Sequence, residues 1–216
     1  MNKILIFLFA ISISACSFVT NIQESFKSED SDFTLLLNSK INFAGTEKIS
    51  LKEFVKTFND EYSDKSKLNN KLFELFSKEF RIQIPGIKFS RLESQIPQVI
   101  QGDISSKNGN KALLDSFFDT LDSDYLIFIK SIEINNAYEN LQYYNAATST
   151  MSGSSSEKCI VFMEVELWDV ANQRCLLRFK GIGRDTVILF SYLSSLNGAI
   201  KNAVAHSVEY IKNEAI

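Results

Sequence analysis

Two neighbouring apolar runs decide the fold. The first reads Cys159-Ile160-Val161-Phe162-Met163-Glu164-Val165-Glu166-Leu167-Trp168-Asp169, and the second reads Arg174-Cys175-Leu176-Leu177-Arg178-Phe179-Lys180. Both are rich in the β-branched, aromatic and aliphatic residues that suit a pleated sheet, and only a short turn near Ala171-Asn172-Gln173 separates them. The pattern predicts an antiparallel hairpin.

Charge selects the register of this hairpin. If residues whose numbers sum to 344 are paired, Glu166 lies opposite Arg178 and Glu164 lies opposite Lys180. The other face then holds two apolar pairs, Val165 with Phe179 and Leu167 with Leu177. A shift by one residue removes both sets of matches. We therefore expect the two glutamates to face solvent beside their basic partners.

The same register bears on a disulfide between Cys159 and Cys175. It places Cys175 opposite Asp169, ten residues from Cys159, or roughly 33 Å along the strand. A disulfide needs Cα atoms within about 7 Å. Both cysteines are expected to be small core residues.

Working outward, the pattern predicts further strands and helices. Strand candidates are Phe33-Leu37, Ile41-Phe43, a run over Arg81-Ile84 and Ile87-Phe89 broken by Pro85-Gly86, and Asp124-Ile134. Helical spacing is seen over Leu51-Tyr62, Leu68-Phe80 and Leu113-Leu121, and in a terminal helix whose apolar face is Leu189, Leu193, Leu196, Ile200, Val204, Val208 and Ile211. The expected fold is α/β (α+β): a mixed sheet of about five strands, ending in a three-stranded antiparallel meander, with helices packed on it.

Residues 135–158 lose apolar periodicity. They contain Tyr138, Tyr143 and Tyr144, followed by a run of Ser, Thr and Gly. We predict a long loop within a hairpin excursion, and long loops of this kind are often functional. The three tyrosines are candidate partner contacts, because tyrosine is enriched at interface hot spots. The alternative is a solvated loop.

The N-terminus resembles an export signal followed by a lipidation site. Lys3 is followed by the apolar run Ile4-Ile13, which is too short to span a bilayer, so residues 1–15 are predicted to be a signal peptide. Ile13-Ser14-Ala15-Cys16 resembles the bacterial lipobox, which implies that Cys16 receives diacylglycerol and a further acyl chain such as palmitate. A plain secretory signal with an incidental cysteine is the alternative. Two or more acyl chains anchor a protein stably.

The residues after Cys16 predict a short tether. Residues 16–32 are polar and acidic, and about sixteen flexible residues span roughly 20–25 Å. A single domain is expected over residues 33–216. Ser17 follows the lipidated cysteine in place of Asp, which by resemblance to lipoprotein sorting favours the outer membrane, facing the periplasm.

Composition excludes several classes of function. The chain has 216 residues, 45% of them hydrophobic, and a net charge of −3, which lacks the basic excess expected for nucleic-acid binding. His206 is the single histidine, so a His-Cys metal site has few possible ligands. A serine hydrolase triad would have to use His206, and the sequence has no Gly-x-Ser-x-Gly motif around a nucleophilic serine. Gly181-Ile182-Gly183 is a fragment of a dinucleotide fingerprint, and we interpret it as a bend where the strand leaves the sheet. No catalytic residue, metal or cofactor is predicted.

Three short motifs carry a family resemblance. They are Ser123-Asp124-Tyr125-Leu126-Ile127, Leu167-Trp168-Asp169-Val170 and Gly181. With the order of elements, they resemble envelope lipoproteins whose domain is like the N-terminal domain of TolB, a group that includes the curli secretion lipoprotein CsgG and the penicillin-binding-protein activator LpoB. The resemblance implies helices on a mixed sheet, no catalytic residues, and action through protein contacts.

Three hypotheses follow from these observations. The first is a lipid-anchored adaptor of the cell envelope that binds a periplasmic or outer-membrane protein. The second is a subunit of an oligomeric secretion or assembly complex. The third is a small-ligand carrier or enzyme, which would need a pocket with convergent polar groups. The partner and the oligomeric state are left open by the sequence.

Overall fold

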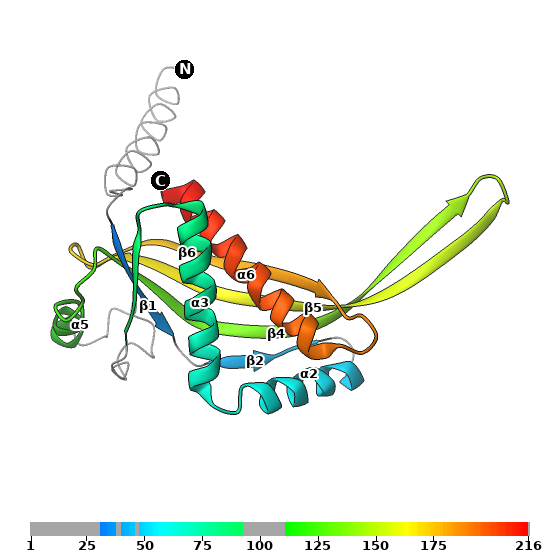
Figure 1. The fold of residues 1–216 in the computed structure, drawn as a ribbon, viewed down its shortest axis with the longest axis horizontal. Helices are drawn as coiled ribbons and strands as arrows, with labels where there is room; N and C mark the ends of the chain where they lie inside the picture. Colours follow the sequence, from blue (N-terminus) through cyan, green and yellow to red (C-terminus); the bar gives the residue numbers. More distant parts are fainter. Residues whose placement is uncertain (1–30, 38–39, 46–47, 93–110, 216) are drawn as a thin grey trace, which may run out of the picture.

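The chain folds into one mixed sheet with helices packed against it (Figure 1). The computed structural model describes residues 31–37, 40–45, 48–92 and 111–215. Cys16, the tether up to residue 30 and the connection over residues 93–110 lie outside them, and Asp32, placed at the end of the predicted tether, is the first residue of a strand. The elements are β1 (Asp32–Leu37), β2 (Ile41–Phe43), α2 (Lys48–Glu61), α3 (Lys65–Gln83), β3 (Lys88–Arg91), α5 (Lys111–Phe118), β4 (Tyr125–Asn145), β5 (Thr150–Asp169), β6 (Arg174–Thr186) and α6 (Tyr192–Ala215).

The described residues form six strands, of which five follow the order β3-β1-β4-β5-β6 and the sixth, β2, pairs with β4 beyond the end of β1. β1 is parallel to both β3 and β4, whereas β4, β5 and β6 form an antiparallel meander. The predicted fold class is confirmed, with six strands instead of about five. The short β3 stands at the sheet edge, as the Pro85-Gly86 turn before it indicated.

The predicted register of β5 and β6 is confirmed in its central part. Glu166 pairs with Arg178 and Glu164 with Lys180. A bulge between Leu167 and Trp168 then shifts the pairing, so Cys175 lies opposite Trp168 and not opposite Asp169. Both cysteines are free. Nine residues of β5 separate their positions, or roughly 30 Å.

The core has two unequal layers. On one face of the sheet, α2, α3 and α6 cover the larger cluster, which includes Phe54, Phe76, Val165 and Ile200. The opposite face is covered by α5 at one end, where Phe117 and Phe118 pack with Leu126, Phe128 and Trp168. The predicted bounds differ from the structure at the C-terminal end of α3 and at the N-terminal end of α6.

Residues 81–83 belong to α3, so the strand predicted over Arg81-Ile84 is wrong. Leu72, Phe76, Phe80 and Ile84 are buried at a spacing of four residues, which keeps one helical face on the core up to the C-cap at Ile84. At the other end of the chain, α6 begins at Tyr192, so Leu189 lies before the helix and not on its apolar face.

Gly181 and Gly183 do not mark a bend, because β6 stays paired with β5 through both. They let α6 approach the sheet. A Cβ on Gly183 would lie 1.9 Å from the Ala199 carbonyl oxygen, and one on Gly181 would lie 2.0 Å from Ser207 Oγ. Only residues without a side chain fit at this contact.

The predicted loop over residues 135–158 is wrong, because these residues continue β4 and β5. The two strands stay paired out to Asn145 and Thr150, joined by a four-residue turn. Residues 138–145 of β4 and 150–157 of β5 form a two-stranded ribbon that projects beyond the sheet (Figure 1). A ribbon with water on both faces has no apolar alternation, so the periodicity that identifies a strand is missing.

Candidate interaction site at the ribbon

The root of the ribbon is tied to two helices through tyrosines. Tyr138 Oη lies 3.3 Å from Ser50 Oγ of α2. Tyr192, the first residue of α6, lies near the same serine and packs its ring edge-on against Phe54, with centroids 5.0 Å apart. Burial raises the pKa of Tyr192, and the nearby Glu157 carboxylate raises it further. These contacts set the direction in which the ribbon leaves the domain.

A second group of polar contacts closes the root from inside. Asn136 is buried, and its Nδ2 donates to Glu157 Oε1 at 3.4 Å. The Val187 amide donates to the Glu157 carbonyl at 2.9 Å, just after β6 ends. Lys158 Nζ bonds Thr186 Oγ1 at 2.6 Å and pairs with Glu139 at 3.5 Å. The strands are thus fixed where they leave the sheet.

The ribbon itself offers two unpaired strand edges. β2 pairs with β4 only as far as Ile134, and β6 pairs with β5 only from Lys158 inward. Among the described residues, no third strand pairs with positions 138–145 or 150–156. The eight cross-strand pairs extend roughly 25 Å. Such edges are templates on which another strand can add through main-chain hydrogen bonds.

The predicted partner contacts all lie on this ribbon. Tyr138 stands at the root with 47% of its surface exposed. Tyr143 and Tyr144 lie near the tip, opposite Ser152 and Met151, and their side chains lie outside the described part of the structure. On β5 the partners are small, since Ser152, Gly153, Ser154, Ser155 and Ser156 follow one another. The sequence identified these tyrosines but missed the unpaired strand edges that surround them.

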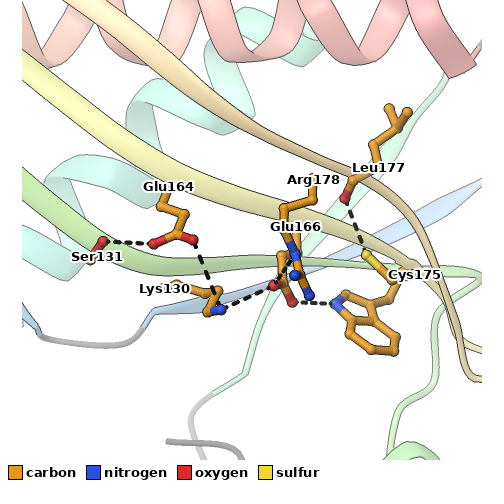
Figure 2. Close-up of polar contacts among 8 residues, drawn as sticks. Lys130, Ser131, Glu164, Glu166, Cys175, Leu177 and Arg178 are labelled. Atoms are coloured by element: carbon orange, nitrogen blue, oxygen red, sulfur yellow. Dashed lines mark hydrogen bonds and ion pairs between the residues drawn. The ribbon is translucent and has the colours of Figure 1, made fainter. Parts of the chain in front are cut away.

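The most concentrated charge cluster lies elsewhere, on the face of the sheet opposite α6 (Figure 2). Glu166 is only 1% exposed, which corrects the expectation that it faces solvent. Its carboxylate accepts from Trp168 Nε1 at 2.9 Å and pairs with Arg178 Nε at 2.9 Å and Lys130 Nζ at 3.3 Å. Because three donors surround a buried carboxylate, the cluster is suited to holding three strands together rather than to acid–base chemistry.

Glu164 is the more exposed of the two glutamates. It accepts from Ser131 Oγ at 3.2 Å and lies 3.9 Å from Lys130 Nζ. The charge match that predicted the register also involves Lys130, which sequence reasoning missed. Alternation along β4 places Lys130 on this face, as it does Leu126 and Phe128. The bulge between Ile129 and Ser131 then adds Ser131 to the same face.

Neither described thiol is a ready nucleophile. Burial raises the pKa of Cys159 to about 12, and burial together with Glu166 raises that of Cys175 to about 11. The reactive form of cysteine is the thiolate, so both stay protonated near neutral pH. His206 is exposed on α6, where its Nδ1 accepts from the Ile182 amide at 3.4 Å. Asp124 accepts the Asp32 amide at 3.0 Å, the backbone role expected of a short acid before a strand.

The described residues contain no group of three or more His, Cys, Asp or Glu side chains that could hold a metal ion. None of the helices among them combines the length and the apolar character that a membrane span requires.

Comparisons with known proteins give weak likenesses. No family model matches the chain, and no curated protein does. Among solved structures, the hypothetical protein CT253 from Chlamydia trachomatis is 8% identical with a TM-score of 0.44, over 86% of this chain and 98% of that one. Lipoprotein GNA1162 from Neisseria meningitidis is 11% identical with a TM-score of 0.32, over 85% and 99%. The PelC dodecamer from Paraburkholderia phytofirmans is 13% identical with a TM-score of 0.33, over 84% and 89%. Likenesses of this size carry no argument about what this chain does.

Proposed function

We propose that this chain is a lipid-anchored, non-catalytic adaptor of the bacterial cell envelope that binds a protein partner through its ribbon. The observation that carries the proposal is the pair of unpaired strand edges over residues 138–145 and 150–156. A two-stranded ribbon is marginally stable in water by itself, and pairing with a strand of a partner would satisfy its outer main-chain groups.

The N-terminal sequence supplies the anchor in this proposal. Residues 1–15 direct export, and Cys16 carries the lipid that holds the domain to the outer membrane on its periplasmic side. The adaptor role is favoured over an enzyme because the charged cluster is closed around Glu166 and the thiols are protonated.

The test uses a photoreactive amino acid in place of Tyr143 in living cells, with mass spectrometry of the adducts. One defined envelope protein should be captured. The matched control replaces Lys212, which is exposed at the far end of α6, and should give no such adduct. Equal adducts at both positions, or none at Tyr143, would contradict the proposal.

A ribbon deletion sharpens this test. Tyr138 and Glu157 face each other, so residues 139–156 can be replaced by Asn-Gly, the sequence of a tight hairpin turn. We expect the domain to fold with the sheet intact and the partner to be lost. Retention of the partner would move the contact away from the ribbon.

A second candidate is a subunit of an oligomeric assembly, because the same two edges could pair with the ribbons of neighbouring copies. It predicts that the full chain in mild detergent elutes as an oligomer and that the ribbon deletion converts it to a monomer. A monomeric full chain would exclude this candidate and leave the adaptor.

A further inference from the structure

Three consecutive apolar side chains stand in solvent between β6 and α6. Ile188 is 66% exposed, Leu189 is 92% exposed and Phe190 is 84% exposed. Single exposed apolar residues are ordinary on protein surfaces, but a contiguous group of large ones marks a contact site. The terminal helix does not use them, since it begins at Tyr192.

The backbone holds this loop in an ordered turn. Leu189 and Phe190 have φ values of 48° and 61°, in the left-handed region that bulky residues rarely adopt. The Ser191 amide donates to the Ile188 carbonyl at 2.9 Å, and the Tyr192 amide donates to the Phe190 carbonyl at 3.0 Å. Strained backbone at apolar residues is retained when the surrounding structure or a function requires it.

Aromatic and apolar groups surround the base of the loop. Leu193, in the first turn of α6, is 39% exposed. Tyr138 Oη lies 3.3 Å from Ser50 Oγ and Tyr192 lies near the same serine, so two tyrosines lie where the loop joins the domain. An apolar tip of this kind suits the boundary of a bilayer, where the acyl chains receive it.

The loop and the predicted anchor lie at opposite ends of the sheet. The anchored end is marked by β1, which begins beside Tyr125, and Tyr125 pairs with Asp169 of β5. The loop comes directly after Val187, whose amide donates to the carbonyl of Glu157 in β5. The twelve residues of β5 between them span roughly 40 Å. Figure 1 shows the loop at the ribbon end of the sheet, away from the C-terminus. The tether predicted from the sequence, with a span of roughly 20–25 Å, would keep the anchored end near the membrane, and a sheet lying along the surface would bring the loop to the same surface.

We propose that Ile188, Leu189 and Phe190 insert into the surface of the bilayer that holds the lipid anchor, as a second membrane contact that fixes the orientation of the domain. This inference rests on the proposed anchoring for nearness to the membrane. The charged residues around the loop are of both signs, Glu157 and Asp185 with Lys158 and Arg184. Contact is therefore apolar in origin and changes little with salt.

The test measures depth in the membrane with the full chain. A fluorescent amino acid is placed at Leu189, or at Lys212 as the matched control at the other end of α6. The protein is reconstituted into vesicles of phosphatidylethanolamine with a minor fraction of phosphatidylglycerol. Lipids brominated on the acyl chains should quench the label at Leu189 several-fold more than the label at Lys212, at low and high salt alike.

The outcomes separate the loop from the anchor. Equal weak quenching at both positions, in a chain that floats with the vesicles, overturns the inference and leaves the anchor intact. Flotation of Cys16→Ala equal to the wild type counts against the anchor, while quenching at Leu189 would still support the loop. The variant Leu189→Ser/Phe190→Ser should float normally and become more accessible to protease.

A photoreactive phenylalanine analogue at Phe190 distinguishes lipid from protein in cells. Phospholipid adducts support insertion. A single protein adduct without lipid overturns it and assigns the loop to a protein interface.

Discussion

The contact between α6 and β6 gives the most quantitative prediction, for Gly183→Ala. The new Cβ would lie 1.9 Å from the Ala199 carbonyl oxygen and 2.3 Å from the Ala203 amide nitrogen. Ordinary contacts begin near 3.4 Å, so the helix must retreat by about 1.5 Å, the difference between 3.4 and 1.9. Both obstructing atoms are backbone, so no side-chain rotation relieves the clash.

We expect a loss of about 2–3 kcal/mol in the free energy of unfolding. Overpacking a filled interior costs about 1–3 kcal/mol, and this clash belongs at the upper end because a whole helix must move. The lower entropy of an unfolded chain with Ala in place of Gly returns up to about 1 kcal/mol when the native backbone accepts Ala. For a chain of this size, the midpoint of thermal unfolding should fall by about 5–10 °C.

The assay is thermal and urea unfolding of the full chain in mild detergent, followed by circular dichroism and by Trp168 fluorescence. Gly198→Ala is the matched control in the same interface. Its Cβ would lie 1.8 Å from Asp185 Oδ2, the end of a side chain that can turn away, and Ala gains about 1 kcal/mol over Gly in a helix. We expect this variant within about 1 kcal/mol of the wild type. Equal stability of Gly183→Ala and Gly198→Ala would refute the argument that β6 and α6 touch through backbone.

Three other predictions follow from the polar contacts and the N-terminus. Glu166→Ala removes the acceptor that Arg178, Lys130 and Trp168 share, and should lower the free energy of urea unfolding by about 2 kcal/mol, a figure reduced for the exposure of Arg178. Glu164→Ala should cost less than about 1 kcal/mol. Equal losses would contradict the argument that the burial of Glu166 makes its contacts the stronger ones. Burial raises the pKa of Tyr62 to about 12 from 10.0, so the native state keeps its phenol protonated and the associated stability is present below pH 10 and lost as the pH rises through 12. Tyr62→Phe should therefore flatten the fall in unfolding free energy between pH 10 and 12, after an initial loss of about 1 kcal/mol for the hydrogen bond to Asn197; a fall as steep as in the wild type would remove Tyr62 as its source. Cys16→Ala should leave the melting profile unchanged and move the chain out of the membrane fraction, and tight membrane association of this variant would count against the lipid.

The sequence by itself determined the arrangement of neighbours that meet across a short turn. Charges and apolar residues on two adjacent runs can be matched one register at a time, which is why Glu166 and Arg178 could be paired in advance. The edge position of β3 and the separation of the two cysteines followed from the same local information. Alternation on one buried face carries this information, and the central sheet has such a face.

Only the tertiary structure decided the unpaired edges of the ribbon and the exposed apolar loop before α6. The ribbon escaped prediction because both of its faces meet water, so its residues carry no periodic signal. Leu189 fits the apolar spacing of α6, yet the helix begins three residues later and leaves it in solvent. Gly181 and Gly183 are explained by Ala199 and Ser207, residues of another element. Contacts between elements distant along the chain depend on how the helices pack, and local pattern does not encode that.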